Sequence, residues 1–150
     1  MGGWCFIGAG VSMLLVGLWG CAVHLGTVPT PGFSLAELRA PVVEPGVDDA
    51  VRGAIIEALA TRHAAGSTPL SLSIERADWR PGRRSGDVVV YDATLSVRFV
   101  TGDRQRVVTA TAPYADPGTA GSAATLRHAS FEDLARRVAA EGVAWLVLGQ

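Results

Sequence analysis

Four arginines close together are the side chains whose types and spacing most clearly suggest chemistry. They flank a segment rich in Pro and Gly, residues 80–86, which predicts a turn between two strands. Guanidinium groups bind phosphate through paired hydrogen bonds, so such a cluster can hold an anionic lipid headgroup or another phosphate. Asp78 and Asp87 lie nearby, and the alternative is a solvated hairpin tip. Trp79, beside the cluster, is expected in the core. The four residues are Arg76, Arg80, Arg83 and Arg84.

Little else in the sequence suggests catalysis or metal binding. The three histidines, His24, His63 and His128, are far apart in sequence, and none pairs with another at helical spacing. Ser122 lacks the Gly-x-Ser-x-Gly elbow of a nucleophile, and the glycines before it lack the Lys of a phosphate loop. The acidic residues are scattered, with no pair placed for acid–base catalysis. We therefore expect no catalytic residue, no metal site and no cofactor, and the chain is predicted not to be an enzyme.

The N-terminal segment has the character of an export signal or a membrane anchor. The first charged side chain is Glu37, and an apolar run covers residues 4–23. About 20 apolar residues can span a bilayer, whereas signal peptidases recognise a shorter apolar run followed by small residues. Length alone does not distinguish the two.

The end of this run favours lipidation. Residues 18–21 read Leu-Trp-Gly-Cys and resemble the lipobox of bacterial lipoproteins, in which the Cys is acylated and becomes the first residue of the mature chain. By this resemblance residues 1–20 are a signal peptide, Cys21 is the lipidation site and residues 21–32 are a lipidated tether. Trp19 is bulky for its position and no Arg or Lys precedes it, so an uncleaved anchor helix and a plain secretory signal remain alternatives.

The composition fits one domain after this apolar start. The chain has 150 residues, a net charge of −1 and 49% hydrophobic residues, and its 13 basic residues are all arginine. The remaining residues, about 130, can form one hydrophobic core. Because the charges nearly balance, no broad basic field is expected, and we predict no nucleic-acid partner.

Alternating apolar and polar residues predict four strands. The longest covers residues 88–100, and residues 107–114 return beside it. Residues 70–74 alternate strictly, and the apolar phase slips after Ile74, which predicts a bulge. Residues 33–43 are ambiguous between helix and strand, and we favour a strand that ends near residues 41–43.

Two segments have the apolar spacing of amphipathic helices. The first begins near Val47 and is expected to end at about Gly66. The second is expected to begin with Ser130 as its N-cap and Asp133 in its first turn. Gly142 weakens this second helix, but its lack of a side chain would allow close packing.

The predicted element order is β-α-β-β-β-α. An antiparallel sheet with both helices on one face would bury the apolar side of each helix. We therefore predict an α+β two-layer sandwich of about four mostly antiparallel strands, forming a single domain over residues 33–150.

Four segments in this order resemble one family of bacterial lipoproteins. They are the Leu-Trp-Gly-Cys at 18–21, a stretch at 38–45 that leads into the helix, the long strand at 90–99, and Tyr-Ala-Asp-Pro at 114–117 before an Ala-rich loop and a helix. Together they resemble the LptE family of lipopolysaccharide-assembly lipoproteins over about residues 18–148. The order and lengths of the elements carry this resemblance more than any single motif.

The resemblance implies a place and a role. The protein would be lipid-anchored to the periplasmic side of the outer membrane. It would partner a large outer-membrane β-barrel of the LptD type and assist delivery of lipopolysaccharide to the outer leaflet. Family members bind lipopolysaccharide with basic residues at the sheet end away from the anchor, which here would be the four arginines. The alternatives are a PqiC-like accessory lipoprotein of an ABC-type lipid transporter and a structural lipoprotein of a secretion system.

Overall fold

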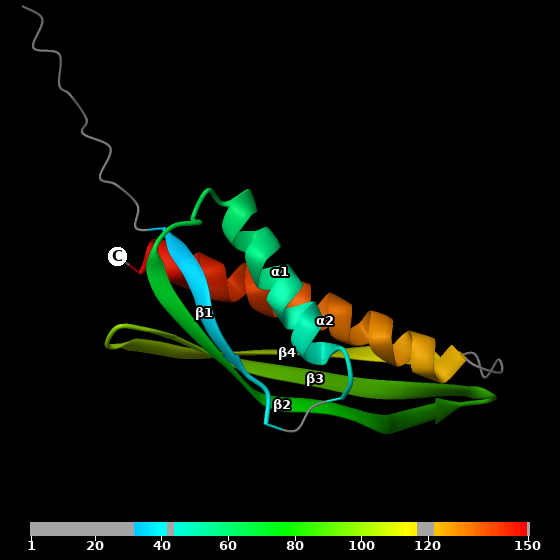
Figure 1. Cartoon of the computed structure of the whole chain (residues 1–150). Coiled ribbons are helices and arrows are strands. Elements are labelled where there is room, and N and C mark those ends of the chain that lie inside the picture. Colours follow the sequence, from blue (N-terminus) through cyan, green and yellow to red (C-terminus); the bar gives the residue numbers. More distant parts are fainter. Residues whose placement is uncertain (1–31, 42–43, 117–121, 150) are drawn as a thin grey trace, which may run out of the picture.

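The domain is a four-stranded sheet covered on one face by two helices (Figure 1). The computed structural model describes residues 32–41, 44–116 and 122–149. Within these residues the order is β-α-β-β-β-α, so the predicted α+β two-layer fold is confirmed. The elements are β1 (Phe33–Arg39), α1 (Val47–Thr61), β2 (Thr68–Ser85), β3 (Val88–Thr101), β4 (Arg104–Asp116) and α2 (Ser122–Leu148).

The sheet is mixed, with the strand order β1-β2-β3-β4. β1 pairs with β2 in parallel, beginning with Phe33 beside Thr68, and α1 forms the crossover between them. The other two pairings are antiparallel, as predicted. Because β1 begins beside the first residue of β2, the far end of β2 lies at the opposite end of the sheet from the start of the described chain.

The second strand is much longer than its alternation predicts. β2 has 18 residues, and the turn is limited to Gly86 and Asp87, so the prediction of a turn over residues 80–86 is wrong. Pairing with β3 continues to Ser85 opposite Val88 and keeps this segment extended. The register shifts after Ile74, which confirms the predicted bulge. The register shifts again between Pro81 and Arg84. Pro81 has no backbone N–H to donate to β3, and an irregularity in the pairing accommodates it.

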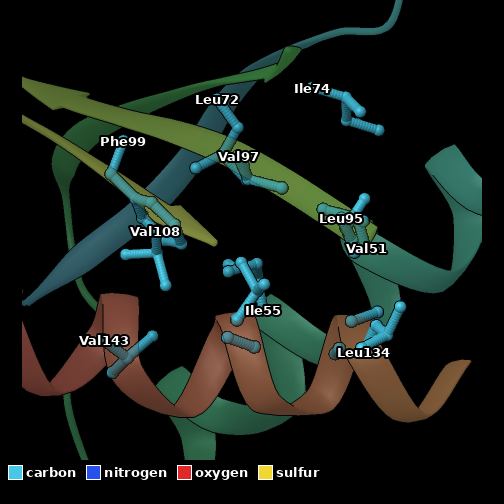
Figure 2. Close-up of a cluster of buried hydrophobic side chains, with 14 of the residues drawn as sticks. Val51, Ile55, Leu72, Ile74, Leu95, Val97, Phe99, Val108, Leu134 and Val143 are labelled. Atoms are coloured by element: carbon cyan, nitrogen blue, oxygen red, sulfur yellow. The ribbon is translucent and has the colours of Figure 1, made fainter. Parts of the chain in front are cut away.

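The core lies between the sheet and the helices (Figure 2). Val97 and Phe99 of β3 are completely buried and face side chains from both helices, such as Ile55 and Val143. Gly142 of α2 lies directly over Phe99, because a Cβ atom at Gly142 would come within 2.1 Å of the phenyl Cζ. The predicted close packing at this glycine is therefore confirmed.

The helix ends differ from the prediction. α1 ends at Thr61 rather than near Gly66, and His63 takes the left-handed conformation (φ 51°) that turns the chain toward β2. This earlier end lets the Ala64 carbonyl accept a hydrogen bond from the Phe33 N–H at 2.7 Å, which links α1 to the start of β1.

Ser130 is not an N-cap. α2 begins at Ser122, and Ser130 is buried within it, where its hydroxyl donates to the Leu126 carbonyl at 2.6 Å. The Ala and Leu residues that precede Ser130 are strong helix formers, so the helix starts earlier than the cap pattern indicated. Among the described residues, neither helix combines the length and hydropathy needed to cross a bilayer.

Candidate anion-binding site

The four predicted arginines lie along the second half of β2, toward the end of the sheet farthest from Phe33 (Figure 1). A strand rises about 3.3 Å per residue, so Arg76 lies about 26 Å along β2 and Arg84 about 53 Å. They are therefore strand residues that extend from the middle of β2 to its end, rather than parts of a loop. Cys21 and residues 1–31 lie outside the described residues, so the predicted lipidation site and cleavage remain predictions.

Two of the arginines share one carboxylate. The Arg76 guanidinium forms an ion pair with Asp78, and Arg80 Nη2 lies 3.3 Å from the same Asp78 Oδ2. Both arginine side chains are more than half exposed, so each pair contributes little to stability. Asp78 nevertheless offsets part of the positive charge that these residues could offer to an anion.

Arg83 and Arg84 have no ion-pair partner among the described residues. Arg83 lines a cavity of about 450 Å³ with Val90, Asp92 and Pro113 on the face of the sheet that the helices leave open. Arg84 Nε donates to the Gly86 carbonyl at 3.2 Å, which leaves its other guanidinium donors for a ligand. These two residues are the stronger candidates for phosphate contacts.

The strand geometry also divides the cluster. Arg84 pairs with Val89, and alternation along β3 puts Val89 on the helix-covered face with Tyr91. Arg83 lies within the second register shift and lines the open face instead. The sequence predicted these four arginines as one cluster, but it did not predict that Arg83 and Arg84 point to two different faces.

An acidic residue borders the arginine-lined cavity. Asp92 stands opposite Arg80 in the β2–β3 register and lines the cavity with Arg83. A Cβ atom at Gly82 would lie 2.6 Å from Asp92 Oδ2, so the carboxylate rests against the glycine backbone. Any anion in this cavity has to approach Arg83 from the side away from Asp92.

The helix-covered face at this end carries stacked aromatic rings. The Trp79 ring lies 4.8 Å from that of Tyr91, at an angle of 18°, and 6.1 Å from that of Tyr114. The guanidinium carbon of Arg127 lies over the Trp79 ring, 6.0 Å from its centroid. Trp79 is half-buried and packs against the core, rather than lying wholly within it. Apolar residues on alternate positions of β2 and β3 indicated this face, but the stacking depends on cross-strand register.

Tyr114 links β4 to α2. Its hydroxyl donates to Asp133 Oδ2 at 2.7 Å. Partial burial, and then this hydrogen bond to a carboxylate, raises the pKa of Tyr114 to about 12. The same hydrogen bond, with help from Arg137, lowers the pKa of the Asp133 carboxyl below its ordinary value. Asp133 thus has a structural role in the middle of α2, so the prediction that it lies in the first turn of this helix is wrong.

The segment before α1 is joined to α2 by a second polar contact. Arg127 Nη1 lies 3.1 Å from each carboxylate oxygen of Glu44. This ion pair and the Tyr114–Asp133 hydrogen bond hold the first half of α2 over the end of the sheet. In the described part of the chain, no three or more His, Cys, Asp or Glu side chains gather as metal ligands would.

Comparison with known proteins identifies the fold. No protein-family model and no curated protein matches the sequence. A minor lipoprotein from Acinetobacter baumannii has 13% identity and a TM-score of 0.51, over 77% of this chain and 90% of that one. A candidate lipoprotein from Caulobacter crescentus CB15 has 14% identity and a TM-score of 0.52, over 73% of this chain and 87% of that one.

This chain has a fold that occurs in bacterial lipoproteins. The rare lipoprotein B of Shewanella oneidensis is a more distant match, with 12% identity and a TM-score of 0.40 over 77% of this chain and 92% of that one. At these identities the likenesses concern the fold alone. The narrower resemblance to the LptE family stays a prediction.

Proposed function

We propose that this protein is a lipid-anchored envelope lipoprotein, held through Cys21, that partners an outer-membrane β-barrel of the LptD type. It assists the transport of lipopolysaccharide to the outer membrane and catalyses no reaction. The observation that carries this proposal is the position of Arg83 and Arg84, which have no carboxylate partner among the described residues and lie at the sheet end farthest from Phe33. The fold shared with lipoproteins supports the anchored state.

The distance between anchor and arginines suits a protein that receives a lipid away from its own membrane contact. Eleven peptide units join Cys21 to Gly32 in the sequence. Fully extended, such a segment reaches about 35–40 Å. The arginines lie about 50 Å farther along β2. An anionic headgroup held there would be well separated from the bilayer surface that carries the anchor.

The open face of the sheet suits contact with a polar protein surface. The hydroxyls of Thr94 and Thr111 lie 3.1 Å apart, and those of Ser96 and Thr109 lie 2.8 Å apart. Ser96 is buried, but Thr109 and Thr111 are exposed and give this face hydroxyl groups rather than an apolar surface. The interior of an outer-membrane barrel is also lined by polar side chains, so this face is compatible with packing against such an interior.

The test of the partner and anchor is an affinity pull-down of the tagged full-length protein from detergent-solubilised envelope, with intact-mass analysis of its N-terminus. We expect an acylated Cys21 and a co-purifying outer-membrane β-barrel. An ABC-type transporter or a secretion complex in place of the barrel would overturn the partner assignment and keep the anchor. An unmodified Met1 would overturn the lipidation of Cys21.

The test of the lipid site is a comparison of two double variants. Arg83→Ala with Arg84→Ala should weaken binding of lipopolysaccharide, because it removes the two guanidinium groups of the cluster that no described carboxylate offsets. Arg76→Ala with Arg80→Ala is the matched control: it removes the same charge from the residues that Asp78 already offsets. Equal affinity in both double variants and the unaltered protein would overturn the assignment of this site.

A further inference from the structure

A second cavity lies at the same end of the domain, on the helix side of the sheet. Its volume is about 380 Å³, and it opens between the residues that lead into α1 and the first turns of α2. Arg127 belongs to its lining and lies over Trp79 of β2, which fixes its position relative to the arginine-bearing end of the sheet. The described lining residues are Glu44, Pro45, Val47, Ala123, Ala124, Arg127, His128 and Phe131.

The inner part of this cavity is apolar. Val47 and Phe131 are almost fully buried, with 2% of each residue exposed, and they belong to the hydrophobic core. Ala123 and Ala124 lie on exposed positions of α2 and leave room where a larger side chain would fill the opening. A hydrocarbon group that entered here would cover Ala123 and Ala124 and reach the edges of these core side chains, which favours binding.

The polar side of the cavity offers guanidinium donors. Arg127 Nη1 donates to Glu44, whereas Arg127 Nε is buried and has no hydrogen-bond acceptor in the described part of the chain. An unpaired donor of a charged group is costly, and most such groups in proteins have a partner. A ligand oxygen that drew Arg127 slightly toward the cavity could satisfy it. His128 also lines the cavity, but its Nε2 lies 3.3 Å from Glu132 Oε1, so Arg127 is the main donor.

The charge of Glu44 restricts the class of ligand. Its carboxylate already holds Arg127, so a doubly charged phosphate would meet repulsion from Glu44. A carboxylate or an ester carbonyl needs only one or two of the remaining donors. With an apolar floor and one guanidinium at the side, the lining matches an acyl chain that ends in a carboxyl or ester group.

We propose that this cavity binds a single acyl chain, with its carboxyl or ester oxygens at Arg127 and its methylene groups against Val47 and Phe131. The proposal does not rest on the lipopolysaccharide-transport function, since it concerns another cavity, which neither Arg83 nor Arg84 lines. It would stand if the partner of this protein were not a β-barrel.

The test is photolabelling of the full-length protein in lipid nanodiscs with a myristic acid analogue that carries a diazirine near its methyl end. We expect the label to concentrate in the proteolytic fragments that contain Val47 and Phe131, and unlabelled myristic acid to displace it. Label spread over the surface, or label that myristic acid does not displace, would overturn the proposal.

A phosphatidylglycerol with the same diazirine-bearing chain distinguishes the source of the ligand. Label at Phe131 from the free acid alone would support a fatty acid as ligand. Label from the phospholipid as well would support a membrane lipid chain as ligand. Absence of label at this site from both probes would contradict the proposal.

Two variants test the site itself. Ala124→Trp should lower labelling at Phe131 by about tenfold because the indole fills the cavity opening. Its matched control is Ala140→Trp, an exposed alanine of α2 that lines a separate groove of about 240 Å³, and it should leave labelling unchanged. Equal loss in both variants would overturn the assignment, and circular dichroism checks that both remain folded.

Arg127→Met tests the polar end. It should weaken binding of the fatty acid by about tenfold and leave the matching fatty alcohol unaffected, because only the acid depends on a charge-assisted hydrogen bond. An equal loss for the acid and the alcohol would show that Arg127 only shapes the cavity, and would overturn its assignment to the carboxyl group.

Discussion

The two faces of the sheet are built from alternate residues of the same strands, but they differ in burial and in polarity. On β3, Leu95, Val97 and Phe99 are completely buried beneath the helices. Between them, Ser96 and Arg98 point to the open face, where they bond to Thr109 and Glu75. The difference teaches that one face determines the fold and its stability, while the other is free to carry polar groups for recognition.

The largest expected effect comes from emptying the buried face. Phe99→Ala should lower the free energy of unfolding by about 3–5 kcal/mol, because it removes a fully buried ring and leaves a cavity under α2. Urea denaturation followed by circular dichroism measures this loss. Arg98→Ala, one residue away on the open face, should cost less than about 1 kcal/mol. Similar losses in the two variants would contradict the comparison.

Overfilling the same face should have the next largest effect. Gly142→Ala is expected to destabilise the protein by about 1–3 kcal/mol, although alanine is the better helix former, because its methyl group meets the Phe99 ring. Adding Phe99→Leu should recover part of this loss, which a double-mutant cycle would detect. A stabilising effect of Gly142→Ala alone would mean that α2 is not held so close to β3.

Tyr114→Phe tests the polar link at the edge of the buried face, and its expected cost is about 1 kcal/mol. Because the folded pKa of Asp133 is lowered, the contribution of this carboxylate is complete above its ordinary pKa and is lost as pH falls through the lower folded value. Because the folded pKa of Tyr114 is raised to about 12, its contribution is complete below the ordinary tyrosine value and is lost as pH rises toward about 12.

The pH dependence provides the measurement for this variant. Stability followed by chemical denaturation should fall less steeply at acid pH in Tyr114→Phe than in the unaltered protein. A spectrophotometric titration should also lose the tyrosinate transition near pH 12. An unchanged acid limb together with an unchanged alkaline transition would mean that the Tyr114–Asp133 hydrogen bond does not form in solution.

The smallest effect is expected on the open face. Ser96→Ala combined with Thr109→Val removes the hydroxyl pair but keeps two residues that a strand tolerates. The free energy of unfolding, measured by thermal denaturation, should therefore fall by less than about 1 kcal/mol. Leu95→Ala, the buried neighbour of Ser96, is the matched control and should cost about 2–5 kcal/mol. A larger loss from the hydroxyl pair than from Leu95 would reverse the roles of the two faces.

The sequence by itself determined the order of the elements and which face of each is apolar. Strict alternation in β3 and helical spacing in both helices are local patterns, so they can be identified without knowing what lies opposite. The four arginines stand close together in the sequence, so they could be grouped without knowing the fold, and the apolar start before Cys21 is a property of composition.

Only the tertiary structure decided where the elements end and which side chains meet. β2 continues through Pro81 and Gly82 because β3 pairs with it, and the register shift there sends Arg83 and Arg84 to different faces. Tyr114 reaches Asp133, and Gly142 reaches Phe99, across many residues of intervening sequence. Such contacts depend on register and distance between segments that are remote along the chain, and local periodicity contains no information about either.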